Sequence, residues 1–91
     1  MSRLEKTFVI INKLGLHARA ATQLVQLANT FAATVTLHLG NKQASANSVL
    51  GLMMLEGNQG KEVTVVSEGE QAAEALAAVE ALIVGRFNEA E

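Results

Sequence analysis

The sequence predicts an α+β fold in which one four-stranded antiparallel sheet carries its helices on one face. Apolar side chains recur at helical spacing in two stretches, 18–29 and 72–83. Residues Thr34–Leu39 alternate between polar and apolar side chains, as in a strand with one buried face. The Gly40-Asn41 pair that follows is typical of a tight hairpin turn. These observations give the element order βαββαβα within a single domain, 1–91.

The first strand is expected over residues 6–12, where β-branched and aromatic side chains are concentrated. Phe8 and Ile10 lie on one face of such a strand, and Val9 and Ile11 on the other. This pattern predicts a strand that is well buried. A glycine-containing loop, 13–16, follows it.

The first helix is expected over 18–29, because its apolar residues share one side of a helix. These residues are Ala21, Leu24, Val25, Ala28 and Phe31. In the second strand, Val35, Leu37 and Leu39 should point inward. The hairpin turn then leads into a short third strand, Lys42–Ser45.

A short second helix is expected over 48–55, with Asn47 as its N-cap and a left-handed residue in the Gly57-Asn58 pair at its end. The fourth strand should follow over 61–67.

The last helix should begin with a capping box, because Ser67 and Glu70 are three residues apart. It should reach about Gly85. Its inner face is expected to comprise Ala72, Leu76, Val79 and Ile83.

The composition indicates a folded chain that is held together by packing. Hydrophobic residues make up 49% of the 91 residues and charged residues 18%, unlike the composition of disordered proteins. The chain has no cysteine, which excludes disulfides and thiolate metal sites. Its formal charge of −2, with scattered Lys and Arg, provides no basic stripe for nucleic acid.

No apolar run is long enough to cross a membrane, and the N-terminal segment 1–6 is charged rather than apolar. We therefore expect a cytoplasmic protein with no membrane partner, and a monomer.

The segment from Gly15 to Arg19 is the candidate site, because it lies where a loop enters the first helix. A helix start presents free backbone N–H groups and a partial positive charge, which favour an anion by about 0.3–1 kcal/mol. His17 can act as a nucleophile near neutral pH, and Arg19 adds a permanent cation with planar donors. A phosphoryl group on His17 would lie within reach of these donors.

A metal site is not expected. The two histidines, His17 and His38, are far apart in the sequence, and His38 lies on the polar face of a predicted strand. We assign His38 no role and expect no bound cofactor.

Two motifs resemble those of the HPr phosphocarriers of the phosphoenolpyruvate-dependent phosphotransferase system. The run Gly15-Leu16-His17-Ala18-Arg19-Ala20-Ala21 is similar to the active-site signature of that family. The run Ser45-Ala46-Asn47-Ser48-Val49-Leu50-Gly51-Leu52 is similar to its regulatory-serine segment, and is closer to the nitrogen-related (NPr) branch than to the sugar branch. With the chain length and element order, the resemblance spans essentially the whole chain and implies an open-faced sandwich.

The resemblance also implies roles for particular residues. His17 would accept a phosphoryl group on Nδ1, Arg19 would stabilise it, and the backbone N–H groups of Ala18 and Arg19 would bind it. The donor would be Enzyme I or its nitrogen-branch equivalent, and the acceptor an enzyme IIA-type protein, so that the chain is a phosphocarrier rather than an enzyme. Ser48 matches the serine that a dedicated kinase modifies in some members, although serine in the first turn of a helix is common without modification.

Apolar residues near His17 are the candidate partner surface. We assign Leu16, Val49, Leu50 and Met53 to this surface. Leu52 and Leu55 are expected to point into the core.

One departure from the family pattern leaves alternatives open. Ala20 stands where the family usually has proline, which removes some stiffness from the helix start, a loss of about 0.4–1 kcal/mol. The alternatives are a regulatory binding module that has the carrier fold but no transfer, and an acylphosphatase-like hydrolase. The retention of His17 and Arg19 disfavours the first, and the absence of an arginine-bearing glycine-rich loop disfavours the second.

Overall fold

The computed structural model describes residues 2–91; Met1 lies outside the described residues. Its elements are β1 (Ser2–Val9), α1 (Ala18–Ala28), β2 (Thr34–Leu39), β3 (Lys42–Ser45), α2 (Val49–Met53), β4 (Glu62–Gly69), α3 (Ala72–Val84) and a 3-10 turn, η1 (Arg86–Asn88). The predicted order βαββαβα is confirmed, and η1 follows it.

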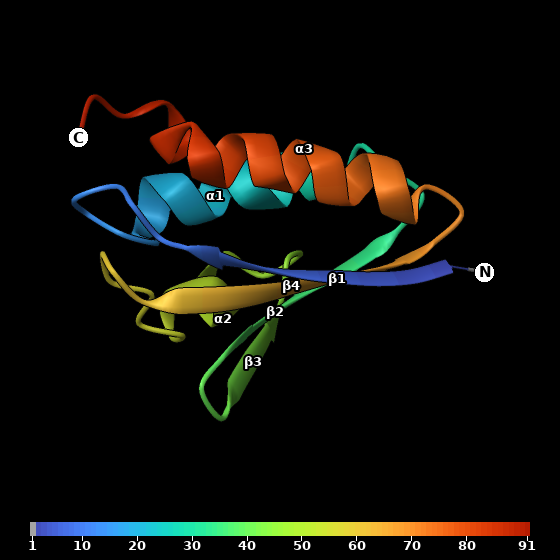
Figure 1. The fold of residues 1–91 in the computed structure, drawn as a ribbon, viewed down its shortest axis with the longest axis horizontal. Coiled ribbons are helices and arrows are strands. Elements are labelled where there is room, and N and C mark those ends of the chain that lie inside the picture. Colours follow the sequence, from blue (N-terminus) through green and yellow to red (C-terminus); the bar gives the residue numbers. More distant parts are fainter. Residues whose placement is uncertain (1) are drawn as a thin grey trace.

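The four strands form one sheet in the order β1-β4-β2-β3, and every neighbouring pair is antiparallel. Helices α1 and α3 run along one face of this sheet, as Figure 1 shows, and α1 also contacts the short helix α2. The α+β open-faced sandwich is therefore confirmed. It places the start of α1 and the chain after α3 at the same end of the molecule (Figure 1).

The core lies between the sheet and the helices. Its largest buried side chains include Phe87, Ile10, Leu24, Leu37, Leu52, Leu55, Ile83 and Val79. The opposite face of the sheet is more polar, and the hydroxyl groups of Thr7 and Thr64 hydrogen-bond across it at 2.8 Å. One buried face and one polar face are what an antiparallel sheet of this kind tolerates.

Two expectations about the first strand are wrong. The strand runs over Ser2–Val9 rather than 6–12, because β4 continues to Gly69 and provides a pairing partner as far back as Ser2. The strand is also mostly exposed, since Phe8, at 8%, is the one buried residue in Ser2–Val9, whereas Leu4 is 37% and Val9 47% exposed.

The start and end of α2 also differ from the prediction. Its N-cap is Ser48 rather than Asn47, because the Ser48 hydroxyl reaches the N–H of Gly51 at 3.0 Å. The helix is shorter than expected, and the left-handed residue after it is Glu56, with a φ of 56°. Gly57 serves a different purpose: a Cβ there would lie 2.8 Å from Cδ1 of Ile10.

The predicted capping box of the last helix is absent. Ser67 is buried within β4, and the N-cap of α3 is Gln71, whose side chain accepts a hydrogen bond from the N–H of Ala32 at 2.7 Å. The chain turns only at Gly69, where φ is 124°, so the helix begins beyond the reach of Ser67. On the inner face, Ala75 is fully buried and Leu76 is half-buried.

Candidate functional site

The loop between β1 and α1 is fixed by backbone packing. Gly15 has a φ of 66°, and a Cβ there would lie 2.3 Å from the carbonyl oxygen of Gly57. The next residue, Leu16, donates its N–H to that same oxygen at 2.9 Å. The amide of Asn12 donates to the carbonyl of Gly15 at 2.8 Å. These contacts therefore hold His17 in a defined position at the start of α1.

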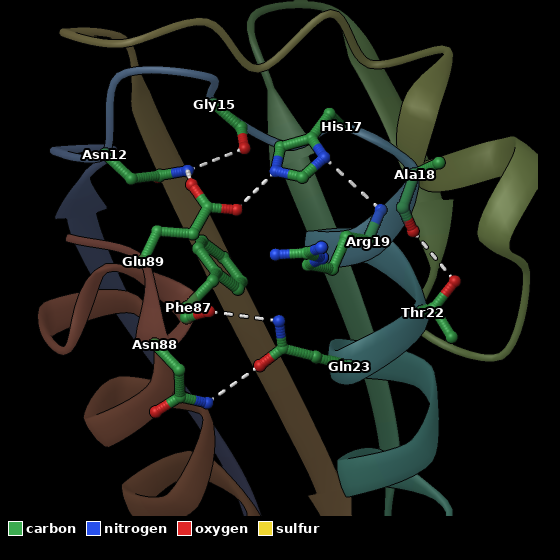
Figure 2. Close-up of polar contacts among 10 residues, drawn as sticks. All are labelled: Asn12, Gly15, His17, Ala18, Arg19, Thr22, Gln23, Phe87, Asn88 and Glu89. Atoms are coloured by element: carbon green, nitrogen blue, oxygen red, sulfur yellow. Dashed lines mark hydrogen bonds and ion pairs between the residues drawn. The ribbon is translucent and has the colours of Figure 1, made fainter. Parts of the chain in front are cut away.

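His17 is the N-cap residue of α1. Its backbone is extended, and its Nδ1 accepts a hydrogen bond from the N–H of Arg19 at 3.3 Å. The side chain is 28% exposed, so a large partner can reach it. Ala18 begins the helix, which places the backbone N–H groups of the first turn beside the imidazole (Figure 2).

A carboxylate from the other end of the chain contacts the second ring nitrogen. Glu89 hydrogen-bonds to Nε2 of His17, and its other oxygen accepts from the Asn12 amide at 3.0 Å (Figure 2). Asn12 is completely buried, and the side chain of Glu89 is 11% exposed. These contacts join two segments that are distant in the sequence, the loop before α1 and the chain after α3.

The surroundings of Glu89 favour its ionised form. Burial acts to raise the pKa of its carboxyl group, but hydrogen bonds from His17 and Asn12, and the charges of His17 and Arg19, outweigh burial. The pKa of Glu89 consequently lies below its ordinary value of 4.5. At neutral pH the carboxylate has no proton to donate.

The imidazole also borders two hollows in the surface. One is lined by Arg19, Glu89 and the loop residue Leu14, and the other by Leu14 and Met53. The first contains the helix start and the cations Lys13 and Arg19, which favour an anion, together with the carboxylates of Glu89 and Glu91. The second mixes the apolar side chains of Leu14 and Met53 with the polar side chains of Glu56 and Asn58, a combination that suits contact with another protein.

The structure brings together the predicted residues His17, Ala18 and Arg19 at the start of α1. It places Ser48 at the start of α2, where its hydroxyl caps the helix. Among the predicted partner-surface residues, Leu50 is 68% exposed and Met53 is 39% exposed.

Two residues assigned to the partner surface are placed differently. Leu16 is only 6% exposed and belongs to the core, because its neighbour Gly15 turns the chain inward against Gly57; this corrects the expectation for Leu16. Val49 is half-buried and packs against the core. Leu52 and Leu55 are buried, as expected.

Sequence reasoning missed several residues that shape this region. Leu14 and Met54 are each 66% exposed, and their apolar character was the available signal. Asn12 and Glu89 lie 77 residues apart, and no local pattern links two such distant residues.

Within residues 2–91, no cluster of three or more potential metal ligands occurs. No helix among those residues is long and apolar enough to cross a membrane.

Comparisons with known proteins agree with the fold and with the motifs. The family described as the PTS HPr component phosphorylation site matches residues 4–84. Phosphocarrier protein NPr of Shewanella violacea is 52% identical over 90 residues, covering 99% of this chain and 99% of that protein. Phosphocarrier protein HPr of Cupriavidus necator is 44% identical, covering 97% of this chain and 99% of that protein.

Solved structures give the same result. The crystal structure of HPr from Thermoanaerobacter tengcongensis superposes with a TM-score of 0.91 at 39% identity, covering 97% of this chain and 99% of that one. The crystal structure of HPr from Bacillus anthracis gives a TM-score of 0.86 at 35% identity, covering 91% of this chain and 99% of that one. The chain therefore belongs to the HPr family of phosphocarrier proteins of the phosphotransferase system.

Proposed function

We propose that His17 carries the phosphoryl group, accepting it on Nδ1 from an Enzyme I-type donor and passing it to an enzyme IIA-type acceptor. The observation that carries this proposal is the position of Nδ1 at the first turn of α1, where it accepts a hydrogen bond from the N–H of Arg19. A lone pair on Nδ1 is available for attack on phosphorus. A phosphoryl group on Nδ1 takes the place of that nitrogen as acceptor for the helix N–H groups.

The start of α1 stabilises the charge that the reaction brings. The phosphoryl group adds a charge of about −1.5 to −2, which the helix N–H groups and the Arg19 guanidinium offset. Hydrogen bonds to charged groups contribute about 1.5–3 kcal/mol each. Fixed donors of this kind stabilise the charge spread over the phosphoryl oxygens during transfer.

Exposed apolar side chains of the loop before His17 and of the region of α2 form the proposed partner surface. We define it as Leu14, Leu50, Met53 and Met54, which are 66%, 68%, 39% and 66% exposed. Leu14 and Met53 line one hollow with His17, so a partner that covers them also covers the imidazole. Methionine adapts to surfaces of different shape, which suits a carrier that docks on a donor and an acceptor in turn.

Labelled phosphoenolpyruvate with purified Enzyme I of either branch tests the proposal. We expect an acid-labile label on the wild-type protein, its loss in His17→Ala, and its retention in His38→Ala. His38 lies on strand β2 and is the matched control. Label that persists in His17→Ala contradicts the assignment of His17.

The same assay distinguishes the branches and the alternative function. The 52% identity to an NPr protein favours the nitrogen-related, regulatory branch, so we expect faster labelling by the nitrogen-branch donor. No label with either donor would indicate a regulatory binding module that lacks transfer, and Ala20→Pro would then test whether the missing proline is the cause.

A further inference from the structure

The chain after α3 packs against α1 and contacts its N-cap residue, His17. Phe87 is 2% exposed and anchors the segment in the core. Three consecutive residues, Arg86, Phe87 and Asn88, have φ values of 57°, 53° and 63°, which are rare outside glycine. The amide of Gln23 on α1 donates to the Phe87 carbonyl at 3.0 Å and accepts from Asn88 at 2.8 Å (Figure 2). This turn directs the next residue, Glu89, toward His17.

The carboxylate of Glu89 accepts a hydrogen bond from the buried amide of Asn12. Asn12 donates from one amide nitrogen to the carboxylate and to the carbonyl of Gly15, so it holds both the tail and the loop before His17. The family match ends at residue 84, so the tail lies beyond it. The groups that hold the carboxylate of Glu89 against the imidazole of His17 are therefore the buried amide of Asn12 and the buried ring of Phe87.

The two contacts of the imidazole require the same tautomer. An ionised carboxylate only accepts hydrogen bonds, so Nε2 of His17 must carry the proton that binds Glu89. Nδ1 accepts from the N–H of Arg19, so it must carry a lone pair. The hydrogen bond at one ring nitrogen thus decides the state of the other.

We propose that Glu89 is a positioning residue for phosphoryl transfer, holding His17 in the Nε2–H tautomer so that Nδ1 faces the helix start as the nucleophile. This inference rests on the proposed function of His17. Glu89 acts through the imidazole and contacts neither phosphorus nor its oxygens.

The transfer step balances with this assignment. The Nδ1 lone pair forms the new P–N bond, and the electron pair of the breaking P–N bond returns to the donor's histidine nitrogen. The proton on Nε2 stays there, so the imidazole becomes cationic as the bond forms. The Glu89 carboxylate, already bonded to that proton, offsets the developing charge.

Nitrogen-15 NMR of the imidazole tests the tautomer without any transfer reaction. In the neutral wild-type imidazole we expect Nε2 to be protonated and Nδ1 to be unprotonated, with Glu89→Ala moving both signals toward a tautomer average. Glu80→Gln, which removes a surface carboxylate of α3 that pairs with Lys6 of β1, should leave them unchanged. A proton on Nδ1 in the wild type, or unchanged signals in Glu89→Ala, would overturn the proposal.

Transfer rates provide the second readout. We expect Glu89→Ala to slow phosphoryl uptake by roughly tenfold, by analogy with the lower end of what carboxylates that orient metal-binding histidines contribute. The loss should appear in the transfer step rather than in donor binding. Glu89→Gln keeps an acceptor for Nε2 but lacks the charge, so it should keep the tautomer and still transfer more slowly than wild type. A wild-type transfer rate in Glu89→Ala overturns the proposal. A wild-type protein that takes up no label overturns the proposed carrier function of His17, and the NMR signals then decide by themselves whether Glu89 sets the tautomer.

Discussion

The starts of α1 and α2 use the same local device with different surroundings. Each has an N-cap side chain that accepts a hydrogen bond from the first turn: His17 from the N–H of Arg19 at 3.3 Å, and Ser48 from the N–H of Gly51 at 3.0 Å. Helix α1 has 11 residues, whereas α2 has five. A short helix gathers less of the aligned dipole that favours an anion.

The two caps differ in the residues that contact the cap side chain from other parts of the chain. Glu89 supports the imidazole of His17, and that carboxylate is held by Asn12 and by the tail anchored through Phe87. The Ser48 hydroxyl accepts its hydrogen bond from the N–H of Gly51 in its own helix, so this cap stabilises α2 itself. The two helix starts are therefore alike in their caps and differ in the long-range contacts of the cap side chain, which a cap residue alone does not reveal.

The largest expected effect comes from removing the anchor of that support. Phe87→Ala empties a site in the core that is 2% exposed, and we expect it to cost about 3–5 kcal/mol in the free energy of unfolding. Urea denaturation measures this cost. Val84→Ala, at a 59% exposed position nearby, should cost less than about 0.5 kcal/mol.

The same variant tests whether the two helix starts are independent. Hydrogen exchange in Phe87→Ala should increase more at the Arg19 amide than at the Gly51 amide, because the global loss of stability affects both amides whereas the loss of the tail contact affects only the start of α1. Equal increases at both amides would show that the tail supports the whole fold rather than the start of α1.

The loop before His17 should be the next most sensitive. Gly15→Ala combines a left-handed φ of 66° with a Cβ that would lie 2.3 Å from the Gly57 oxygen, so we expect a loss of about 2–5 kcal/mol. Gly40→Ala has a similar φ of 62° with nothing within 4 Å, so it should lose only about 1–2 kcal/mol. Equal losses in thermal or urea unfolding would contradict the role of the Gly15–Gly57 contact.

Local patterns were enough to predict the elements and the position of His17. Strand alternation, helical periodicity and the Gly40-Asn41 turn each depend on neighbours in the sequence, and the α+β fold follows from them. The motif around His17 also carries its own signal.

The incorrect predictions have long-range causes. The length of β1 depends on how far β4 extends, and the burial of Leu16 depends on Gly57. Glu89 is 72 residues from His17, and the packing of Phe87 and the hydrogen bonds of Gln23 and Asn12 to the tail bring the two together. Sequence reasoning therefore identified His17 as the proposed nucleophile but missed the residues that contact its imidazole.

A smaller effect is expected at the second helix start. Ser48→Ala removes the cap of α2 and should cost about 1 kcal/mol, whereas Ser48→Thr keeps a hydroxyl and should cost less. Urea denaturation of the two variants measures the difference. Identical stabilities would mean that the hydroxyl does not contribute as a cap.

The smallest effects on stability are expected from two carboxylates: Glu56, which follows α2, and Glu89, which contacts the cap of α1. Glu56 follows α2, and its pKa is lowered by a hydrogen bond from Lys42 and by the charges of Lys42 and Lys61. The pKa of Glu89 is also lowered, as burial is outweighed by His17, Asn12 and Arg19. A lowered pKa means that each carboxylate stabilises the folded state above its ordinary value of 4.5 and loses that contribution as the pH falls through the folded-state pKa.

Salt should separate these two contributions. The Glu56 side chain is 68% exposed, so the stability difference between wild type and Glu56→Gln should nearly vanish at 1 M salt, where the Debye length is about 3 Å. The difference for Glu89→Gln should persist at neutral pH in 1 M salt, because its carboxylate is 11% exposed, and should disappear only on acidification below pH 4.5. Urea denaturation across pH at both salt concentrations measures the two differences. Loss of the Glu89 difference at neutral pH in high salt would show that its contact with His17 is an ordinary surface ion pair, and the contrast between the two helix starts would then disappear.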